Sequence, residues 1–93
     1  MEEQVRIRTP RGREIFGIVQ SNLGASKMLV RCQDGKIRNC RIPGRLRKKV
    51  WIRENDIVLI EPWETQSDKR ADIVWRYTET QSSLLRRKGI LDI

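Results

Sequence analysis

The chain has 93 residues, the size of one domain, and carries 20 Lys and Arg, 12 Asp and Glu and no histidine, so its formal net charge is +8 at pH 7. No apolar run approaches the ~20 residues that span a bilayer, and residues 1–14 lack the apolar segment of a signal peptide, which indicates a cytoplasmic protein. Without histidine, a phosphate-binding glycine loop, a nucleophile elbow or a set of metal ligands, we expect neither an enzyme nor a cofactor.

The N-terminal half predicts a flexible basic arm followed by three strands. Residues 1–13 contain four arginines together with Pro10 and Gly12, and they predict the arm. Alternation of apolar and polar residues then predicts strands at residues 15–23, 27–32 and 37–42. Gly17 within the first strand indicates a bulge or a sharp bend.

The Asp-Gly pair at residues 34–35 predicts a hairpin between the second and third strands. A two-residue turn places Val30 opposite Asn39, whereas a loop one residue longer places Val30 opposite Cys40. Burial favours the longer loop, because strand register follows the apolar pattern. Cys40 and Cys32 both lie in apolar alternating runs, so we expect buried, reduced thiols.

The middle of the chain predicts a break in the sheet. Pro43 and Gly44 end the third strand, and residues 45–49 form a basic connection of about one helical turn. Residues 50–52 can begin a strand. Apolar runs predict the last two strands at residues 57–61 and 71–77.

Residues 79–93 predict a C-terminal helix with a short tail. Thr78 or Thr80 can cap the N-terminus of this helix, and Gly89 ends it. The apolar pair at residues 84–85 is expected to dock the helix on the strands.

Five short strands, a break between the third and fourth, and closure by the fifth predict an all-β OB-fold barrel of the S1-like type. A short helical turn separates strands three and four, and a C-terminal helix follows. Residues 14–78 then form the barrel domain. An SH3-like barrel is the alternative from the pattern alone.

The net charge is concentrated in residues 35–53, which contain eight basic residues and no acidic residue. The other 74 residues carry equal numbers of basic and acidic groups. A concentrated positive region is typical of a polyanion-binding surface, and the alternative is a solvated, charge-rich loop. Solvated faces usually mix both signs, and Leu46 and Trp51 lie within the run, which favours nucleic-acid binding. Residues 54–79 carry seven acids against three bases and are predicted to lie on a different side.

Five motifs together resemble one family: V-x-x-x-L-G at residues 19–24, C-x-D-G-x-x-R-x-C-x-I at 32–42, G-R-L-R-K-K-V-W-I at 44–52, D-I-V-L at 56–59 and D-K-R-A-D-I-V at 68–74. Over residues 9–90 the chain resembles translation initiation factor 1A, the archaeal and eukaryotic counterpart of bacterial initiation factor one. It lacks the long acidic C-terminal tail of the eukaryotic members and resembles the archaeal type.

The resemblance implies an OB barrel that binds the rRNA of the small ribosomal subunit at the decoding (A) site. There it supports initiator tRNA loading and start-codon selection together with other initiation factors. In the eukaryotic family an acidic C-terminal motif docks initiation factor 5B, and Leu91, Asp92 and Ile93 are the candidate counterpart. The alternative is that these three residues fray or pack on the helix. We expect a monomer that binds no membrane.

Eight residues are expected to contact RNA: Lys27, Arg38, Arg41, Arg45, Arg47, Lys48, Lys49 and Trp51. The resemblance matches the four basic residues of the 44–52 motif to the family's basic block, and their side chains suit phosphate contacts. The alternative is that one or two of their aliphatic stems cover the barrel. Arg38 and Arg41 flank Cys40 and are expected to face solvent. Lys27 stands where the family also places a basic residue.

The three tryptophans are expected to have different roles. Trp51 alternates with Val50 and Ile52, which favours exposure, and an exposed ring can stack on a base for ~1–3 kcal/mol; the alternative is a core position. Trp75 alternates with apolar residues and is expected in the core. Trp63 is expected to pack within a loop.

Two other functions fit parts of the sequence. A generic single-stranded RNA-binding domain or chaperone needs several exposed aromatic rings, and the chain has five aromatic residues in all, which argues against it. A protein-interaction adaptor would instead use the acidic residues and the C-terminus.

Overall fold

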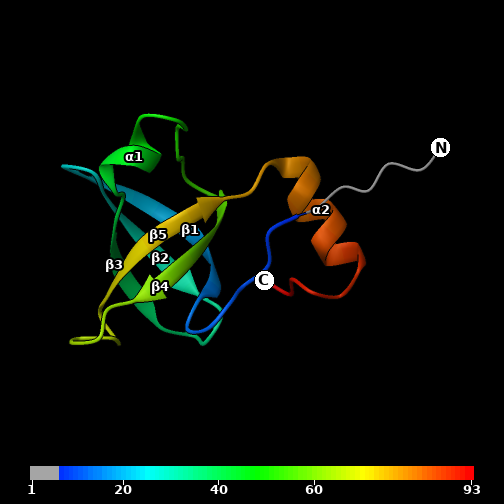
Figure 1. Cartoon of the computed structure of the whole chain (residues 1–93), viewed down its shortest axis with the longest axis horizontal. Coiled ribbons are helices and arrows are strands. Elements are labelled where there is room, and N and C mark those ends of the chain that lie inside the picture. The colour runs from blue at the N-terminus through cyan, green and yellow to red at the C-terminus, as the bar shows by residue number, and fades with distance from the viewer. Residues whose placement is uncertain (1–6) are drawn as a thin grey trace.

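The computed structural model describes residues 7–93, which form five strands and two helices. The elements are β1 (Ile15–Gly24), β2 (Lys27–Cys32), β3 (Ile37–Arg41), α1 (Gly44–Arg47), β4 (Ile57–Pro62), β5 (Arg70–Arg76) and α2 (Glu79–Arg87). The strands close in the order β1-β2-β3-β5-β4, with a parallel contact between β3 and β5. This is the predicted OB-fold barrel, and α1 and α2 lie at different sides of it (Figure 1).

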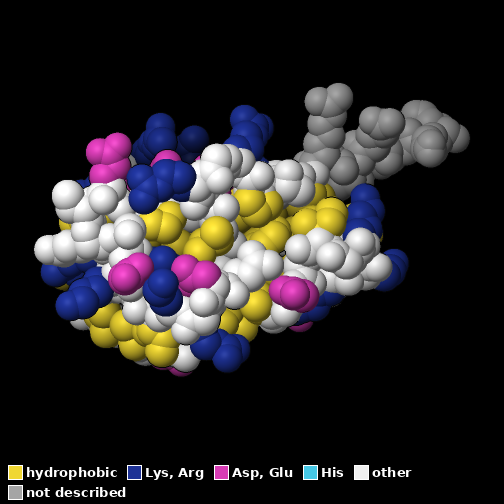
Figure 2. Space-filling model, turned by 90° about the horizontal axis from the view of Figure 1, so that it is seen from below, with side chains coloured by type: hydrophobic (Ala, Val, Ile, Leu, Met, Phe, Trp, Pro, Cys, Tyr) yellow, Lys and Arg dark blue, Asp and Glu magenta, His cyan; other side chains and the backbone are white. Residues whose placement is uncertain are grey.

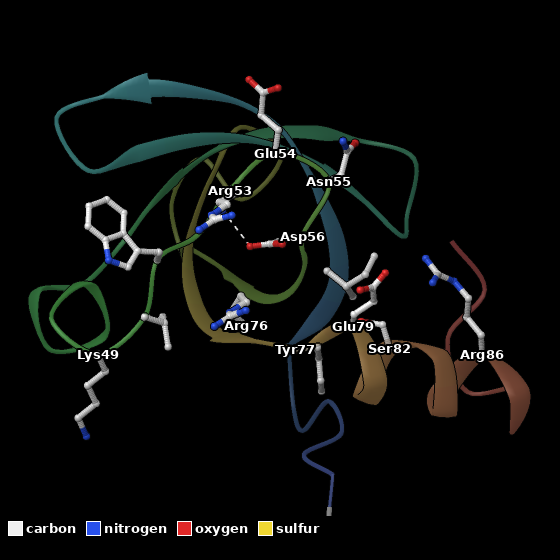
Figure 3. Close-up of a pocket in the computed structure, with 13 residues that line it drawn as sticks. Lys49, Arg53, Glu54, Asn55, Asp56, Arg76, Tyr77, Glu79, Ser82 and Arg86 are labelled. Carbon is white, nitrogen blue, oxygen red and sulfur yellow. Dashed lines mark hydrogen bonds between the residues drawn. The ribbon is translucent and has the colours of Figure 1, made fainter.

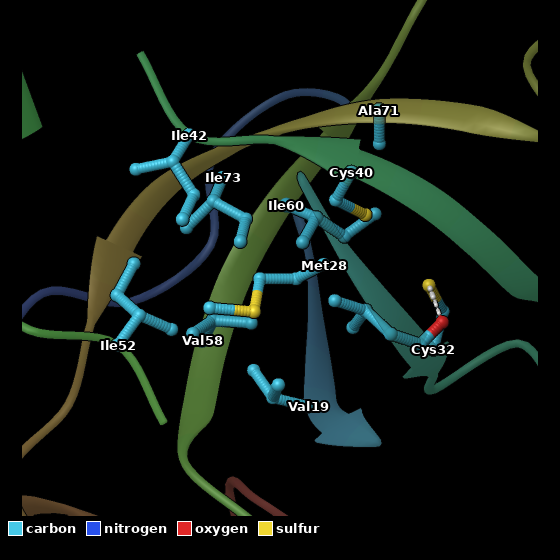
Figure 4. Close-up of a cluster of buried hydrophobic side chains, with 11 residues drawn as sticks. Val19, Met28, Cys32, Cys40, Ile42, Ile52, Val58, Ile60, Ala71 and Ile73 are labelled. Carbon is cyan, nitrogen blue, oxygen red and sulfur yellow. Dashed lines mark hydrogen bonds between the residues drawn. The ribbon is translucent and has the colours of Figure 1, made fainter. Parts of the chain in front are cut away.

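The interior of the barrel is apolar, as the alternation along the strands predicts. Its buried residues are Val19, Met28, Val30, Cys32, Cys40, Ile42, Ile52, Val58, Ile60, Ala71 and Ile73 (Figure 4). Both cysteines are buried and free, as expected, and burial raises the pKa of the Cys40 thiol to about 12. Residues 50–52 do not begin a strand; Ile52 instead points into this core from an irregular segment.

Both predicted registers for the hairpin of β2 and β3 are wrong. The structure pairs Val30 with Arg38 and Met28 with Cys40. The backbone N–H of Cys32 donates to the carbonyl of Lys36 at 2.8 Å, so the loop between the strands is Gln33–Gly35. This register places a charged residue opposite Val30 inside the barrel, which apolar pairing alone does not predict.

Gly17 is required by a close approach of β1 and β2. A Cβ at this position would lie 2.5 Å from Cγ1 of Val30 and 3.3 Å from the carbonyl oxygen of Arg31. The first irregularity in β1 comes later, between Val19 and Ser21. The glycine therefore marks tight packing, and the predicted bulge lies beyond it.

A second apolar core lies outside the barrel, between its wall and α2. Strand β4 is buried on both faces, because Val58 and Ile60 face the barrel interior while Ile57 and Leu59 face the second core. The buried residues of the second core are Phe16, Ile57, Leu59, Tyr77, Leu85 and Leu91. The uninterrupted apolar run of β4 is the sequence sign of this burial on both faces.

Helix α2 begins and ends as predicted. Thr78 caps it, with the Thr78 hydroxyl accepting from the backbone N–H of Gln81 and the Gln81 side chain accepting from the N–H of Thr78. Gly89 follows the helix with a φ of +78°, a conformation that favours glycine. Of the predicted docking pair, Leu85 is buried in the second core and Leu84 is half-buried.

The C-terminal tail packs on the barrel. Leu91 is 2% exposed in the second core, and Ile93 packs against that core. The Arg86 guanidinium donates to the carbonyl of Ile93, which ties the tail back to α2. These contacts favour the interpretation of the tail as helix-packing residues.

The described part of the predicted arm, residues 7–13, contacts the barrel; residues 1–6 lie outside the described residues. Arg8 forms a two-point ion pair with Glu14, with N···O distances of 2.9 and 3.0 Å. The Tyr77 hydroxyl donates to the carbonyl of Arg8. Across residues 7–93, no helix is long and apolar enough to cross a membrane.

The prediction that Trp75 lies in the core is wrong, because Trp75 is 37% exposed. Strand β5 pairs Trp75 with Leu59 but Ile73 with Ile60, so Val74 is an extra residue. Such a bulge reverses the side on which the following residues point.

Replacing Gly17 with alanine should destabilise the barrel by about 1–3 kcal/mol, because the new methyl group collides with β2. Urea unfolding followed by tryptophan fluorescence measures this. Gly44→Ala is the matched control, since a Cβ at Gly44 has nothing within 4 Å and its φ is negative. Equal stability of the two variants would contradict the packing argument.

Leu91→Ala should cost about 2–5 kcal/mol of stability, because it leaves a cavity in the second core. The neighbouring Ile90 is exposed, so Ile90→Ala should stay within about 0.5 kcal/mol of the parent chain. Melting temperatures of the two variants test the point. A melting temperature unaltered by Leu91→Ala would show that the tail contributes nothing to folding.

Candidate nucleic-acid interface

Seven of the eight predicted RNA-contacting residues gather on one basic surface of the barrel, formed by β2, β3 and the segment around α1. We define the basic surface as Lys27, Arg41, Arg45, Arg47, Lys48, Lys49 and Trp51, all of them exposed. Lys27 and Arg41 face each other across β2 and β3. Except for Arg41, none of them forms an ion pair with another residue of the range 7–93.

Apolar anchors hold the α1 segment in place. Pro43 precedes the single turn of α1, and its carbonyl accepts the first backbone hydrogen bonds of the turn. Leu46 and Val50 pack partly against the barrel core, and Ile52 is buried in it. Because these three residues face inward, the basic side chains between them face solvent.

Arg47 connects the α1 segment to the turn between β1 and β2. Its guanidinium donates to the Ser26 hydroxyl. The backbone N–H of Ile42 donates to the Ser26 carbonyl at 2.9 Å, so the two segments are joined at two points. Ser26 precedes Lys27, and the contact therefore links the strand part of the basic surface to its α1 part.

Trp51 is exposed, as the alternation predicts, with 83% of its surface accessible. Its ring lies on the rim of two hollows. One hollow, of about 330 Å³, lies between the β1–β2 turn and residues 50–52. The other is a larger groove on the side facing α2. An exposed indole between basic side chains is suited to stack on a nucleobase.

The prediction that Arg38 faces solvent is wrong, because Arg38 is 3% exposed. Its guanidinium makes a two-point contact with the Asp34 carboxylate at 3.1 and 2.9 Å, and its Nε donates to the Ser67 carbonyl. These partners compensate the burial of the charge, and Arg38 joins the β2–β3 loop to the β4–β5 loop. Arg38 shares the inward face of β3 with Cys40, two residues on, which the sequence pattern could have indicated.

A groove of about 780 Å³ runs between residues 49–57 and α2 (Figure 3). Basic side chains line it from three elements: Lys49, Arg53, Arg76 and Arg86. Acidic side chains also line it: Glu54, Asp56 and Glu79. The buried Nε of Arg76 has no hydrogen-bond partner among residues 7–93. The Arg76 side chain as a whole is half-buried and forms no ion pair within residues 7–93, so its charge is available to an anionic ligand.

Sequence reasoning missed Arg76 and Arg86 as candidate interface residues. Arg76 lies in the acidic stretch of the chain, and the position of Arg86 in the sequence indicates only a favourable charge near the negative end of the helix. Arg86 meets residues 49–57 only through the packing of α2 on the barrel, and Arg76 meets them through the pairing of β5 with β4. A linear pattern carries no signal for either contact.

The acidic stretch does not form a separate side of the molecule. Asp72 pairs with Arg41 at 3.1 Å, and Asp68 pairs with Lys36 at 3.4 Å. Figure 2 shows acidic side chains between basic ones on one face. The parallel pairing of β3 with β5 brings the acidic stretch beside the basic one.

Comparisons with known proteins agree on one family. A family model described as "Translation initiation factor 1A / IF-1" matches residues 2–92. A protein named translation initiation factor 1A from Pyrococcus abyssi is 58% identical over 88 residues, covering 95% of this chain and 78% of the relative. Another with this name, from Methanothermobacter thermautotrophicus, is 55% identical over 92 residues, covering 99% of this chain and 93% of the relative.

A solved structure resembles the fold at lower identity. It is the solution structure of translation initiation factor IF-1 from the Wolbachia endosymbiont of Brugia malayi, with a TM-score of 0.56 and 28% sequence identity. The match covers 72% of this chain and 79% of that chain.

Asp34→Asn should cost about 1–3 kcal/mol at neutral pH, because it removes the charge that compensates buried Arg38. The hydrogen bonds from Arg38 hold the pKa of Asp34 below its usual 3.8. The stabilisation is therefore present above pH 3.8 and is lost as the pH falls through the lowered value. Melting temperatures at pH 7, 5, 3 and 2 should show the parent chain and the variant converging at the acid end.

Asp68→Asn is the control for that series, because its ion pair with Lys36 is exposed and contributes little. Its melting temperature should stay close to that of the parent chain at every pH. A constant gap between the parent chain and Asp34→Asn down to pH 2 would contradict the role of the ionised carboxylate.

Proposed function

The chain belongs to the translation initiation factor 1A and IF-1 family, and from that membership we propose that it binds the small ribosomal subunit at the decoding (A) site. There it supports initiator tRNA loading and start-codon selection in the cytoplasm. Its role is to occupy a site as a monomer, and no catalytic step is assigned to any of its residues.

The observation that carries the proposal is the basic surface with an exposed tryptophan among its charged side chains. Six basic side chains on this surface can neutralise phosphates and release their counterions. Trp51 adds a stacking platform that tolerates any base. The other exposed tryptophan, Trp75, borders a separate hollow lined by residues 7–11 and the end of α2.

The groove beside α2 extends this interface. We assign Arg76 to a phosphate or another anionic RNA group, since it lines the groove and forms no ion pair within residues 7–93. Arg53 and Arg86 line the same groove, and the acidic residues there limit how an RNA backbone can lie. A rigid surface with both signs of charge selects the folded shape of ribosomal RNA over single strands of the same charge.

Proposed partners include initiator tRNA and other initiation factors, initiation factor 5B among them. Leu91 is buried, so Asp92 and the half-buried Ile93 are the parts of the 91–93 segment that such a partner can reach. A contact through Leu91 would require the tail to leave the second core.

Binding to purified archaeal small ribosomal subunits, compared with an unstructured RNA of similar charge at several salt concentrations, tests the proposal. We expect saturable one-to-one binding to the subunit and much weaker binding to the free RNA. Replacing Lys48 and Lys49 with alanine should weaken subunit binding and reduce the salt slope by about 0.7–0.9 for each phosphate that is no longer neutralised. Trp51→Ala should cost about 1–3 kcal/mol.

Replacing Arg87 and Lys88 with alanine is the matched control, because both are exposed residues at the end of α2 and the change removes the same charge. This variant should bind nearly as well as the parent chain. Equal losses in the two double variants would mean that only total charge matters. Equal binding of the parent chain to the subunit and to free RNA would refute the decoding-site proposal.

A further inference from the structure

A cluster of charged and aromatic side chains lies where β3 and β5 run parallel. Arg41 of β3 is the register partner of Asp72 of β5. The Asp72 carboxylate accepts from Arg41 Nη2 at 3.1 Å through one oxygen and from Trp63 Nε1 at 2.9 Å through the other. One carboxylate therefore fixes both an arginine and a tryptophan.

Trp63 in turn contacts two guanidinium groups. The Cζ atom of Arg41 lies 5.6 Å from the centroid of the indole ring, and that of Arg70 lies 5.7 Å from it. Both distances are within the range of cation–π attraction. Trp63 packs in its loop, as the sequence predicts, and its backbone is held by Arg13 and by the carbonyl of Arg70.

This arrangement leaves most guanidinium donors free. The Arg41 side chain is 57% exposed, and within residues 7–93 its only hydrogen bond is to Asp72. Arg70 is half-buried and forms no ion pair within that range. An arginine already held against a ring loses less conformational entropy when its outer N–H groups bind a phosphate.

The cluster is continuous with the basic surface, because Lys27 faces Arg41 across β2 and β3. We propose that Asp72 and Trp63 are positioning residues for RNA: they hold Arg41 and Arg70 with their N–H edges toward the backbone phosphates. This inference rests on the proposed function of binding ribosomal RNA. It assigns an acidic residue a favourable role in binding a polyanion.

For the change in RNA affinity caused by Asp72→Asn, this proposal and long-range electrostatics predict opposite directions. Asp72→Asn removes a negative charge, so long-range electrostatics alone predicts tighter RNA binding and a steeper salt dependence. If Asp72 positions Arg41, the same change should weaken binding to the small ribosomal subunit by about tenfold and make the salt dependence shallower. Affinities of the full chain at three salt concentrations separate the two.

Glu61→Gln is the matched control. Glu61 is the cross-strand partner of Asp72 on β4, is exposed, and forms no ion pair within residues 7–93. Its replacement removes the same charge at nearly the same place without disturbing Arg41 or Trp63. Binding by this variant should equal or slightly exceed that of the parent chain.

Two substitutions of Trp63 separate the ring from the indole N–H. Trp63→Phe keeps an aromatic face but no longer donates to Asp72, and Trp63→Leu removes both. We expect subunit affinity to fall in the order parent, Trp63→Phe, Trp63→Leu. Melting temperatures identify any variant whose fold is damaged, and Trp63→Phe is the one best suited to keep the loop packed.

The outcomes separate this inference from the proposed function. If the parent chain binds the subunit and Asp72→Asn binds as tightly as Glu61→Gln or more tightly, the positioning role is refuted and the proposed function stands. If the parent chain does not prefer the subunit over unstructured RNA, both are refuted. Weaker binding by Asp72→Asn alone, with a shallower salt slope, supports the inference.

Discussion

Burial of β4 on both faces is the constraint on which the rest of the structure depends. One face closes the barrel and the other forms the second core with α2 and the tail, so the helix cannot move without exposing Leu59 and Tyr77. The position of α2 forms one wall of the groove, because Arg86 of the helix faces the 49–57 segment only while α2 is docked, whereas the pairing of β5 with β4 places Arg76. The stability of an apolar core thus determines the shape of a charged surface.

The basic residues within residues 35–53 are of two kinds: some are bound to other groups of the protein, and some are exposed and unpaired within residues 7–93. Arg38 is buried and binds the exposed Asp34 carboxylate and the Ser67 carbonyl, so it links two loops. Arg47 is tied to Ser26, while the lysines that follow α1 remain exposed. Anchored arginines and exposed lysines on one surface suit a binding module that needs both a defined geometry and general attraction to phosphate.

Acidic residues belong to this surface as well. The parallel contact between β3 and β5 places Asp72 against Arg41, and the β4–β5 loop places Asp68 against Lys36. A face with paired charges distinguishes one RNA from another by shape, because an RNA binds well only if its phosphates lie where the basic groups are free. A uniformly basic face would attract any RNA strand equally.

Sequence by itself determined the strands, the barrel, the cap of α2 at Thr78 and the exposure of Trp51, because alternation and capping act between residues close in the chain. The family followed from motifs spread over most of the chain, and the comparisons confirmed it. Only the tertiary structure decided the register that buries Arg38, the bulge that turns Trp75 outward and the groove that contains Arg76. The bulge and the groove depend on contacts between segments that are not neighbours in sequence. The hairpin register is local, but it buries an arginine whose charge Asp34 and the distant Ser67 carbonyl compensate, which the apolar pattern does not indicate.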